Sequence, residues 1–217
     1  MLSLNTPTRR MSIPHPSASP GPTPGRTIIR VVDGLDGLRW QVHEKRRVYE
    51  SDWVNVDLVK VEPPKTEPFE HHVIKLHHVA VALLINENEE VLTLWRYRFA
   101  VDQWGYELIG GLVEEGEDPA ETAAREAVEE TGWRPVGEPE HLGTFQPLPG
   151  IVDAPVNAYI WRHADKVGEP TDGEEAARIE WIPVDRILEL VMRGEVLGSG
   201  AIVPVLFYLA SRGAGSR

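Results

Sequence analysis

Apolar and polar residues alternate along the first part of the chain with the period of a β-strand. Residues 53–61, WVNVDLVKV, alternate at period two and stop at Pro63-Pro64, which is the pattern of a half-buried strand. Residues 38–49 and 69–76 are strand-like on either side of this segment. We therefore expect an antiparallel β meander within residues 28–76.

The pattern then changes to longer apolar runs. Residues 77–86 and 90–99 flank a polar turn and predict a hairpin. A helix is expected from Asp185 to Gly194, and a last helix is expected to carry Pro204 in its first turn and to end near Gly213. Further strands are expected at residues 106–110, 143–146, 156–162 and 178–182. Strands and helices are thus interspersed without regular βαβ units, which predicts a mixed α/β (α+β) fold.

One acidic segment, residues 111–133 (GLVEEGEDPAETAAREAVEETGW), is the most informative stretch of the chain. Asp118 can cap a helix that has Pro119 at its first position and Glu121 at its third, an arrangement typical of a capping box. Gly132 is a suitable C-terminal stop. Ahead of the helix we expect a glycine turn at Gly110-Gly111 and then an acidic loop.

Three carboxylates of this helix are spaced for one face. Glu126, Glu129 and Glu130 stand at i, i+3 and i+4, where like charges repel. Clustered oxygen ligands suit a hard cation such as Mg²⁺. Arg125 is placed to pair with Glu129 or with a loop carboxylate such as Glu117. A small-residue stripe is expected to pack on a sheet and to leave the glutamates pointing into a site: Ala120, Ala124, Ala127, Val128 and Thr131.

A solvated acidic face is the alternative reading of such a charge run. The fixed offsets of the glycines, the arginine and the glutamates argue against it.

Composition limits the remaining possibilities. The chain has 217 residues, 41% hydrophobic content, a net charge of −12 and no cysteine. These values predict one domain with an extension, exclude disulfide and thiol chemistry, and argue against nucleic-acid binding. No apolar run reaches the length of a membrane span, and a chain without cysteine fits the cytoplasm. Residues 1–27 are rich in proline and lack acidic residues, which predicts a disordered tail or a translation start at Met11.

The order of Gly111, Glu117 and the run from Arg125 to Trp133 resembles the Nudix box. The departures are Ala127, where a larger aliphatic residue is usual, and Trp133, where an aliphatic residue or tyrosine is usual. The resemblance implies a Nudix α/β/α sandwich over residues 77–213, which follow the meander in the sequence. It also implies hydrolysis of a nucleoside diphosphate that is linked to another group.

The same resemblance implies roles for the residues of the box. Mg²⁺ or Mn²⁺ would be held by Glu126, Glu129, Glu130 and the backbone carbonyl of Gly110. The other fixed positions of the box would be structural: Gly111, Glu117, Arg125 and Gly132.

Three features resemble the Nudix branch that hydrolyses ADP-ribose and other nucleoside diphosphate sugars. They are the meander, the run of residues 95–98 (WRYR) before the box, and Leu148-Pro149-Gly150 after it. Together these features imply that ADP-ribose is the substrate and is cleaved to AMP and ribose 5-phosphate. In that branch the meander also helps to build a homodimer. The expected substrate-binding residues are Arg96, Arg98, Glu107 and Pro149, and Arg98 is suited to clamp a diphosphate.

The resemblance leaves two points open. The general base would be a loop glutamate, Glu175 or Glu174, or else Glu129 of the box. The substrate could instead be GDP-mannose, another nucleotide sugar or a damaged nucleotide, and a non-catalytic module that senses a nucleotide is the alternative outside enzymes.

Overall fold

The computed structural model describes residues 36–171 and 176–214. The chain divides into two compact units between residues 39 and 40. Within the first unit, Asp36–Leu38 forms a short 3-10 helix. The predicted tail at residues 1–27 and the predicted bases Glu174 and Glu175 lie outside the described residues.

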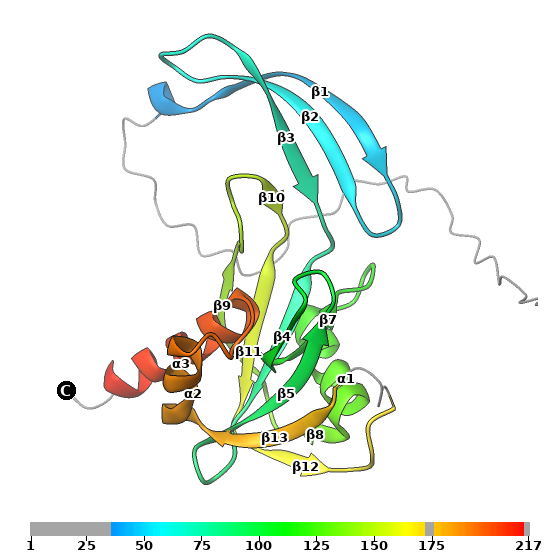
Figure 1. The fold of residues 1–217 in the computed structure, drawn as a ribbon, viewed down its shortest axis with the longest axis vertical. Helices are drawn as coiled ribbons and strands as arrows, with labels where there is room; N and C mark the ends of the chain where they lie inside the picture. Colours follow the sequence, from blue (N-terminus) through cyan, green and yellow to red (C-terminus); the bar gives the residue numbers. More distant parts are fainter. Residues whose placement is uncertain (1–35, 172–175, 215–217) are drawn as a thin grey trace, which may run out of the picture. The chain divides into compact units, whose positions relative to one another are not determined.

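The second unit begins with the expected meander (Figure 1). Its strands are β1 (Gln41–Glu50), β2 (Asn55–Glu62) and β3 (Phe69–Lys75). Neighbouring strands pair antiparallel, and the short strand β10 (Val152–Asp153) adds parallel to β3. The meander sheet therefore includes a strand from much later in the chain, and a domain boundary between residues 76 and 77 stays a prediction.

A buried carboxylate with two cationic partners from the exposed strand β1 supports the meander. The Asp57 carboxylate lies 2.8 Å from Lys45 Nζ and 2.5 Å from Arg47 Nε. These hydrogen bonds from Lys45 and Arg47 lower the pKa of Asp57. Asp57 shares its strand face with Val59 and Val61, both of which are buried.

Two further sheets build the domain that follows the meander. The first has the order β7-β4-β11-β9, in which β11 runs parallel to β4 and the other neighbours are antiparallel. The second has the order β13-β5-β6 and is antiparallel. The strands of the first sheet are β4 (Val79–Leu84), β7 (Ile109–Leu112), β9 (Glu140–Phe145) and β11 (Val156–Trp161). Those of the second are β5 (Glu90–Arg98), β6 (Gln103–Glu107) and β13 (Arg178–Pro183), and β8 (Trp133–Pro135) pairs separately with β12 (Ala164–Lys166).

The predicted hairpin of residues 77–86 and 90–99 is wrong. β4 and β5 lie in different sheets. The two segments pair where they approach the turn, through the bridge between Ile85 and Val91 and the hydrogen bond of 3.0 Å from the Asn86 N–H to the Glu90 carbonyl. Both edges of β4 are already occupied, by β7 and β11. An apolar run shows that a strand is buried, but it does not identify its partners.

The predicted strand at residues 106–110 is also two strands. β6 ends at Glu107 and β7 begins at Ile109, and the two belong to different sheets. Gly110 and Gly111 therefore lie in β7 and not in a turn. A Cβ on Gly110 would lie 2.5 Å from the Ala80 carbonyl oxygen, so the close approach of β7 to β4 requires a glycine there.

Helices cover both sides of the β4 sheet (Figure 1), which confirms the predicted α/β/α sandwich. They are α1 (Pro119–Thr131), α2 (Val184–Met192) and α3 (Ser199–Ala214). Alternate residues of β4 enter two separate cores. Val81 and Leu83 pack in the core that contains α2 and α3, whereas Ala82 and Leu84 pack in the core that contains α1.

The predicted ends of α1 are confirmed. Asp118 Oδ1 accepts a hydrogen bond of 2.8 Å from the Ala120 N–H. Gly132 has a left-handed φ of 70°, and its N–H donates to the Val128 carbonyl at 2.8 Å. The predicted packing stripe is only partly right, because the buried residues are Thr122, Ala123, Ala127, Glu130 and Thr131.

The last helix begins earlier than expected. α3 starts at Ser199, so Pro204 lies inside the helix and not in its first turn. A proline there removes one backbone hydrogen bond near the N-terminal end, where few are yet formed. None of the helices among the described residues combines the length and the apolar character needed to cross a membrane.

Replacing Gly132 by alanine is expected to lower the free energy of unfolding by more than about 2 kcal/mol. The left-handed backbone alone costs a residue with a Cβ about 1–2 kcal/mol, and the new Cβ would lie 2.1 Å from the Gly168 carbonyl oxygen. Gly137 is the matched control, since it has a φ of 86° but no atom within 4 Å of a Cβ. Urea unfolding of Gly132→Ala and Gly137→Ala compares the two, and equal losses would contradict the packing argument.

Candidate functional site

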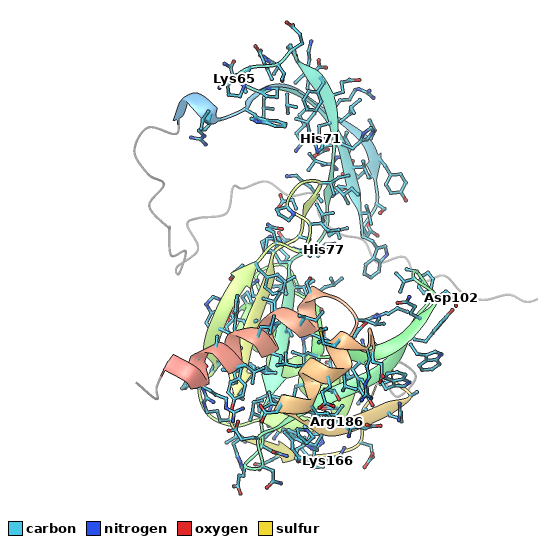
Figure 2. The ribbon with its side chains drawn as sticks, turned by 60° about the vertical axis from the view of Figure 1, so that its left-hand side comes forward. Lys65, His71, His77, Asp102, Lys166 and Arg186 are labelled. Atoms are coloured by element: carbon cyan, nitrogen blue, oxygen red, sulfur yellow. The ribbon has the colours of Figure 1, made fainter. Side chains whose placement is uncertain are left out.

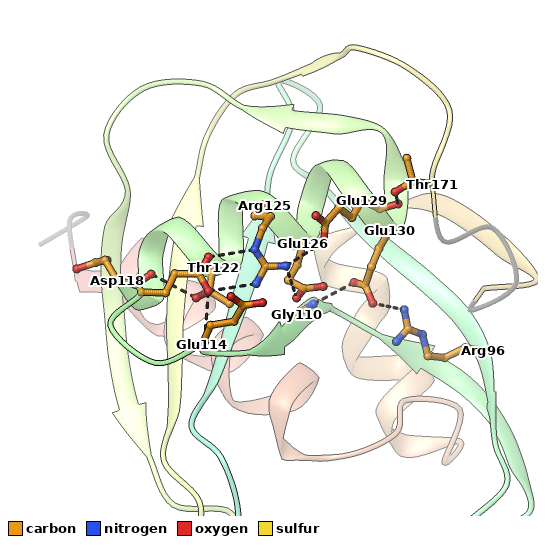
Figure 3. A network of polar contacts seen from close by, with 11 residues as sticks. Arg96, Gly110, Glu114, Asp118, Thr122, Arg125, Glu126, Glu129, Glu130 and Thr171 are labelled. Carbon is orange, nitrogen blue, oxygen red and sulfur yellow. Dashed lines mark hydrogen bonds and ion pairs between the residues drawn. The ribbon is translucent and has the colours of Figure 1, made fainter. Parts of the chain in front are cut away.

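Arg125 is the centre of a network of carboxylates on α1 and on the loop before it (Figure 3). Its Nε and Nη2 donate to the two oxygens of Glu117 at 3.0 and 3.2 Å. Its Nη1 donates to Glu126 Oε1 and to Glu129 Oε2, each at 2.9 Å. Arg125 thus makes both of the pairings that the sequence left open.

Hydrogen bonds also connect Glu117 with Glu114 in the loop before α1. Glu117 Oε2 also accepts from the Glu114 N–H at 3.3 Å, and the Glu117 N–H donates to the Glu114 carbonyl at 3.1 Å. The hydrogen bond from Arg125 lowers the pKa of Glu117 to about 2. Glu117 is therefore ionised at neutral pH and ties the acidic loop to α1.

Gly111 makes room for the Glu126 side chain. A Cβ on Gly111 would lie 2.1 Å from Glu126 Oε1 and 2.3 Å from its carboxyl carbon. The carboxylate therefore rests directly on the backbone of β7. Since Arg125 Nη1 binds both Glu126 and Glu129, the two carboxylates meet at one point above this strand.

Glu130 points into the protein and not toward solvent. Its Oε1 accepts from Arg96 Nη2 at 2.6 Å, and its Oε2 accepts from the Gly110 N–H at 3.1 Å. The side chains of Arg96 and Glu130 are each only 3% exposed. Burial raises the pKa of Glu130 to about 7, although Arg96 and the Gly110 N–H favour its charged form, and the negative charge of Glu126 raises it further.

Arg98 and Glu107 form a second arginine–carboxylate pair. Arg98 Nε and Nη2 donate to the two Glu107 oxygens at 2.9 and 2.6 Å, which is a bidentate arrangement. Arg98 and Arg96 lie two residues apart on β5 and share a strand face. Arg98 is 48% exposed, so Arg98 faces solvent whereas Arg96 does not.

Pro149 lies in an exposed turn that contacts the meander. The Ile151 N–H donates to the Leu148 carbonyl at 3.0 Å to close this turn. The carbonyl oxygen of Gly150 accepts from His71 Nε2 of β3 at 2.8 Å. His77, at the end of the meander, donates from Nε2 to the Asp52 carbonyl oxygen at 2.6 Å. His71 and His77 are labelled in Figure 2.

The carboxylates of α1 are paired with arginine and do not yet surround a cation site. Among residues 36–171 and 176–214, no three His, Asp or Glu side chains already converge as metal ligands. Arg125 instead neutralises Glu126 and Glu129. The chemistry nevertheless fits Mg²⁺ or Mn²⁺, because all the side-chain donors are carboxylate oxygens and two of them already meet at one cationic nitrogen above a glycine.

Three features of the site were not found from the sequence. Arg96 binds Glu130, which lies 34 residues away in the chain. The Gly110 N–H also binds Glu130, whereas the sequence predicted a role only for the Gly110 carbonyl. The N–H of Thr171 donates to the Glu129 carbonyl at 2.8 Å, and its hydroxyl donates to the same oxygen at 3.3 Å. Such pairs are distant in the chain, and no local pattern signals them.

The chain is similar to known proteins over most of its length. The model of the NUDIX domain family matches residues 75–197. A CMP-5'-(N-acetyl-N-hydroxy-3-aminopropyl)phosphonate hydrolase of Streptomyces rubellomurinus is 42% identical over 82% of this chain and 85% of its own length. An ADP-ribose pyrophosphatase of Mycobacterium tuberculosis is 33% identical over 60% of this chain and 64% of its own length.

The fold is also found in a solved structure. The crystal structure of an ADP compounds hydrolase superposes with a TM-score of 0.70 over 82% of this chain and 97% of that chain, at 14% identity. The chain belongs to the Nudix family of hydrolases, because the family model matches more than half of its length and the relative from Streptomyces is 42% identical over most of both chains.

Proposed function

We propose that this Nudix hydrolase cleaves the P–O–P linkage of a nucleoside diphosphate derivative with the carboxylates of α1. The observation that carries the proposal is the meeting of Glu126 and Glu129 at Arg125 Nη1, directly above Gly111. Carboxylates held together in this way by a side-chain cation are suited to exchange part of that contact for a metal ion.

The cation would be held by Glu126, Glu129 and Glu130, with the Gly110 carbonyl as a further oxygen ligand. Mg²⁺ is our first choice and Mn²⁺ the second, since the donors are hard oxygens. When bound, the cation supplies a Lewis acid that neutralises charge on the diphosphate. Gly111 and Glu117 support this arrangement, because one leaves space for Glu126 and the other anchors Arg125.

Arg98 is our proposed diphosphate-binding residue. Its guanidinium is half-exposed and is held in orientation by the two oxygens of Glu107. An arginine that is already oriented loses less freedom when it binds a phosphate bidentately. Glu107 then acts on substrate binding through Arg98. The role of Pro149 in substrate binding stays a prediction, since the contacts of its turn are with the meander.

The general base remains a choice among Glu175, Glu174 and Glu129. Of these three, Glu129 lies among the described residues, on α1 beside Arg125 Nη1. Whichever glutamate is the base would take the proton of the attacking water as its oxygen bonds to one phosphorus and the P–O bond to the leaving phosphate breaks.

ADP-ribose is the leading substrate candidate, to be cleaved to AMP and ribose 5-phosphate. The meander, Arg98 and the relative named ADP-ribose pyrophosphatase support it. A CMP-linked phosphonate is the second candidate, because the 42% identical relative is named for that substrate. Both candidates contain a nucleoside monophosphate joined through an anhydride oxygen to a second phosphorus.

The meander also bears on assembly. β1 ends the sheet order of the meander, and all ten of its residues are exposed. This supports the proposal that the meander joins two copies of the chain in a homodimer. A cytoplasmic location is proposed from the absence of cysteine.

Glu129→Gln and Glu130→Gln are each expected to lower turnover by several orders of magnitude while the fold survives. Each change removes one anionic oxygen ligand and keeps the shape of the side chain. Turnover at saturating Mg²⁺, together with circular dichroism, checks this. Near-normal rates in both variants would contradict the ligand assignment.

Gly111→Ala is expected to keep the melting temperature and to lose most of the turnover. The three atoms nearest its Cβ would all belong to the flexible Glu126 side chain, at 2.1–2.8 Å, so the carboxylate would be displaced. In Gly110→Ala the Cβ would instead meet the Ala80 carbonyl oxygen at 2.5 Å, so that variant is expected to melt at a lower temperature. A lower melting temperature for Gly111→Ala than for Gly110→Ala would contradict the close contact of Gly110 with the Ala80 carbonyl.

The substrate is tested by measuring products over a panel with Mg²⁺ and with Mn²⁺. The panel contains ADP-ribose, a CMP-linked alkylphosphonate, GDP-mannose and 8-oxo-dGTP. We expect a nucleoside monophosphate as product and the highest kcat/KM for ADP-ribose. Binding of ADP-ribose by calorimetry without any release of product from the panel would favour a nucleotide-sensing module.

A further inference from the structure

A buried arginine contacts one of the proposed metal ligands. Arg96 Nη2 of β5 lies 2.6 Å from Glu130 Oε1 of α1, and Glu130 Oε2 accepts from the Gly110 N–H of β7 (Figure 3). The Glu130 carboxylate is thus held from two sides by two different strands. Its orientation is fixed by these strands and not by α1 alone.

The neighbouring Arg98 provides an internal comparison. Both arginines lie on the same face of β5, and each is paired with a glutamate. Arg98 is 48% exposed and Arg96 only 3%. A diphosphate arriving from solvent can therefore contact Arg98, whereas Arg96 is enclosed with Glu130.

We propose that Arg96 is a positioning residue that holds the Glu130 carboxylate in place for the divalent cation, and that it does not bind the substrate. This inference rests on the proposed function, because it requires Glu130 to be a metal ligand. A carboxylate has about four lone-pair sites, and the contacts with Arg96 and Gly110 each use one of them. Glu130 therefore keeps sites for a cation while both contacts remain.

The sign of the effect on metal affinity distinguishes positioning from simple charge. Removing a positive charge near a cation site would by itself tighten metal binding, because a like charge is lost. Loss of a partner that orients a ligand loosens it, typically by about 10–100-fold. Weaker metal binding after removal of Arg96 would therefore show that the Glu130 carboxylate is no longer held in its orientation.

The experiment measures Mn²⁺ binding without substrate, by calorimetry, in the wild type, Arg96→Gln and the matched control Arg98→Gln. In Arg96→Gln we expect the Kd for Mn²⁺ to rise by about 10–100-fold, with the KM for ADP-ribose at saturating Mn²⁺ unchanged and kcat reduced. In Arg98→Gln we expect the reverse: the KM for ADP-ribose rises and the Kd for Mn²⁺ is unchanged. If the panel selects another substrate, that compound replaces ADP-ribose.

Arg96→Lys keeps the test informative if the glutamine variant does not fold. Lysine keeps the buried positive charge and one donor, so we expect a smaller rise in the Kd for Mn²⁺ and again no change in KM. Tighter or unchanged Mn²⁺ binding in both Arg96 variants, or a raised KM in either, would overturn the inference. A wild type that neither binds Mn²⁺ nor hydrolyses the panel would instead overturn the proposed function, and this inference with it.

Discussion

Mutual repulsion among the carboxylates of α1 is the constraint on which the rest of the site depends. Glu126, Glu129 and Glu130 lie within little more than one helical turn, where like charges destabilise a helix. Two arginines offset this repulsion from opposite sides. Arg125, on the helix itself, holds Glu126 and Glu129, and Arg96, from β5, holds Glu130. The three carboxylates thus lie close together while two cationic side chains offset their charge, and under the proposed function a divalent cation would share that role.

Close approach between backbones makes this arrangement possible. Gly110 allows β7 to lie against β4, and Gly111 allows the Glu126 carboxylate to rest on β7. The small side chains of Ala123 and Ala127 are buried and let α1 lie close to the same sheet. Gly110 and Gly111 thus allow α1 and the Glu126 carboxylate to lie close to β7 and the sheet that contains it.

The local parts of the site could be predicted from the sequence because they depend on residues close together in the chain. The Asp118 cap, the Gly132 stop and the pairing of Arg125 with Glu129 all follow from offsets of a few residues. The partners of the apolar strands could not be predicted, because the run that forms β4 indicates burial but not which strands flank it. The Arg96–Glu130 contact and the link from Thr171 to Glu129 depend on that same strand order and were missed with it.

The proposed hydrolysis requires the carboxylates of α1 to hold a divalent cation against a diphosphate. A crystal structure with Mn²⁺ and a non-hydrolysable ADP-ribose analogue, with the metal located by its anomalous scattering, tests it most directly. We expect a metal peak bounded by oxygens of Glu126, Glu129 and Glu130, with the diphosphate between the metal and Arg98. A bound analogue with no metal peak beside these three side chains would contradict it.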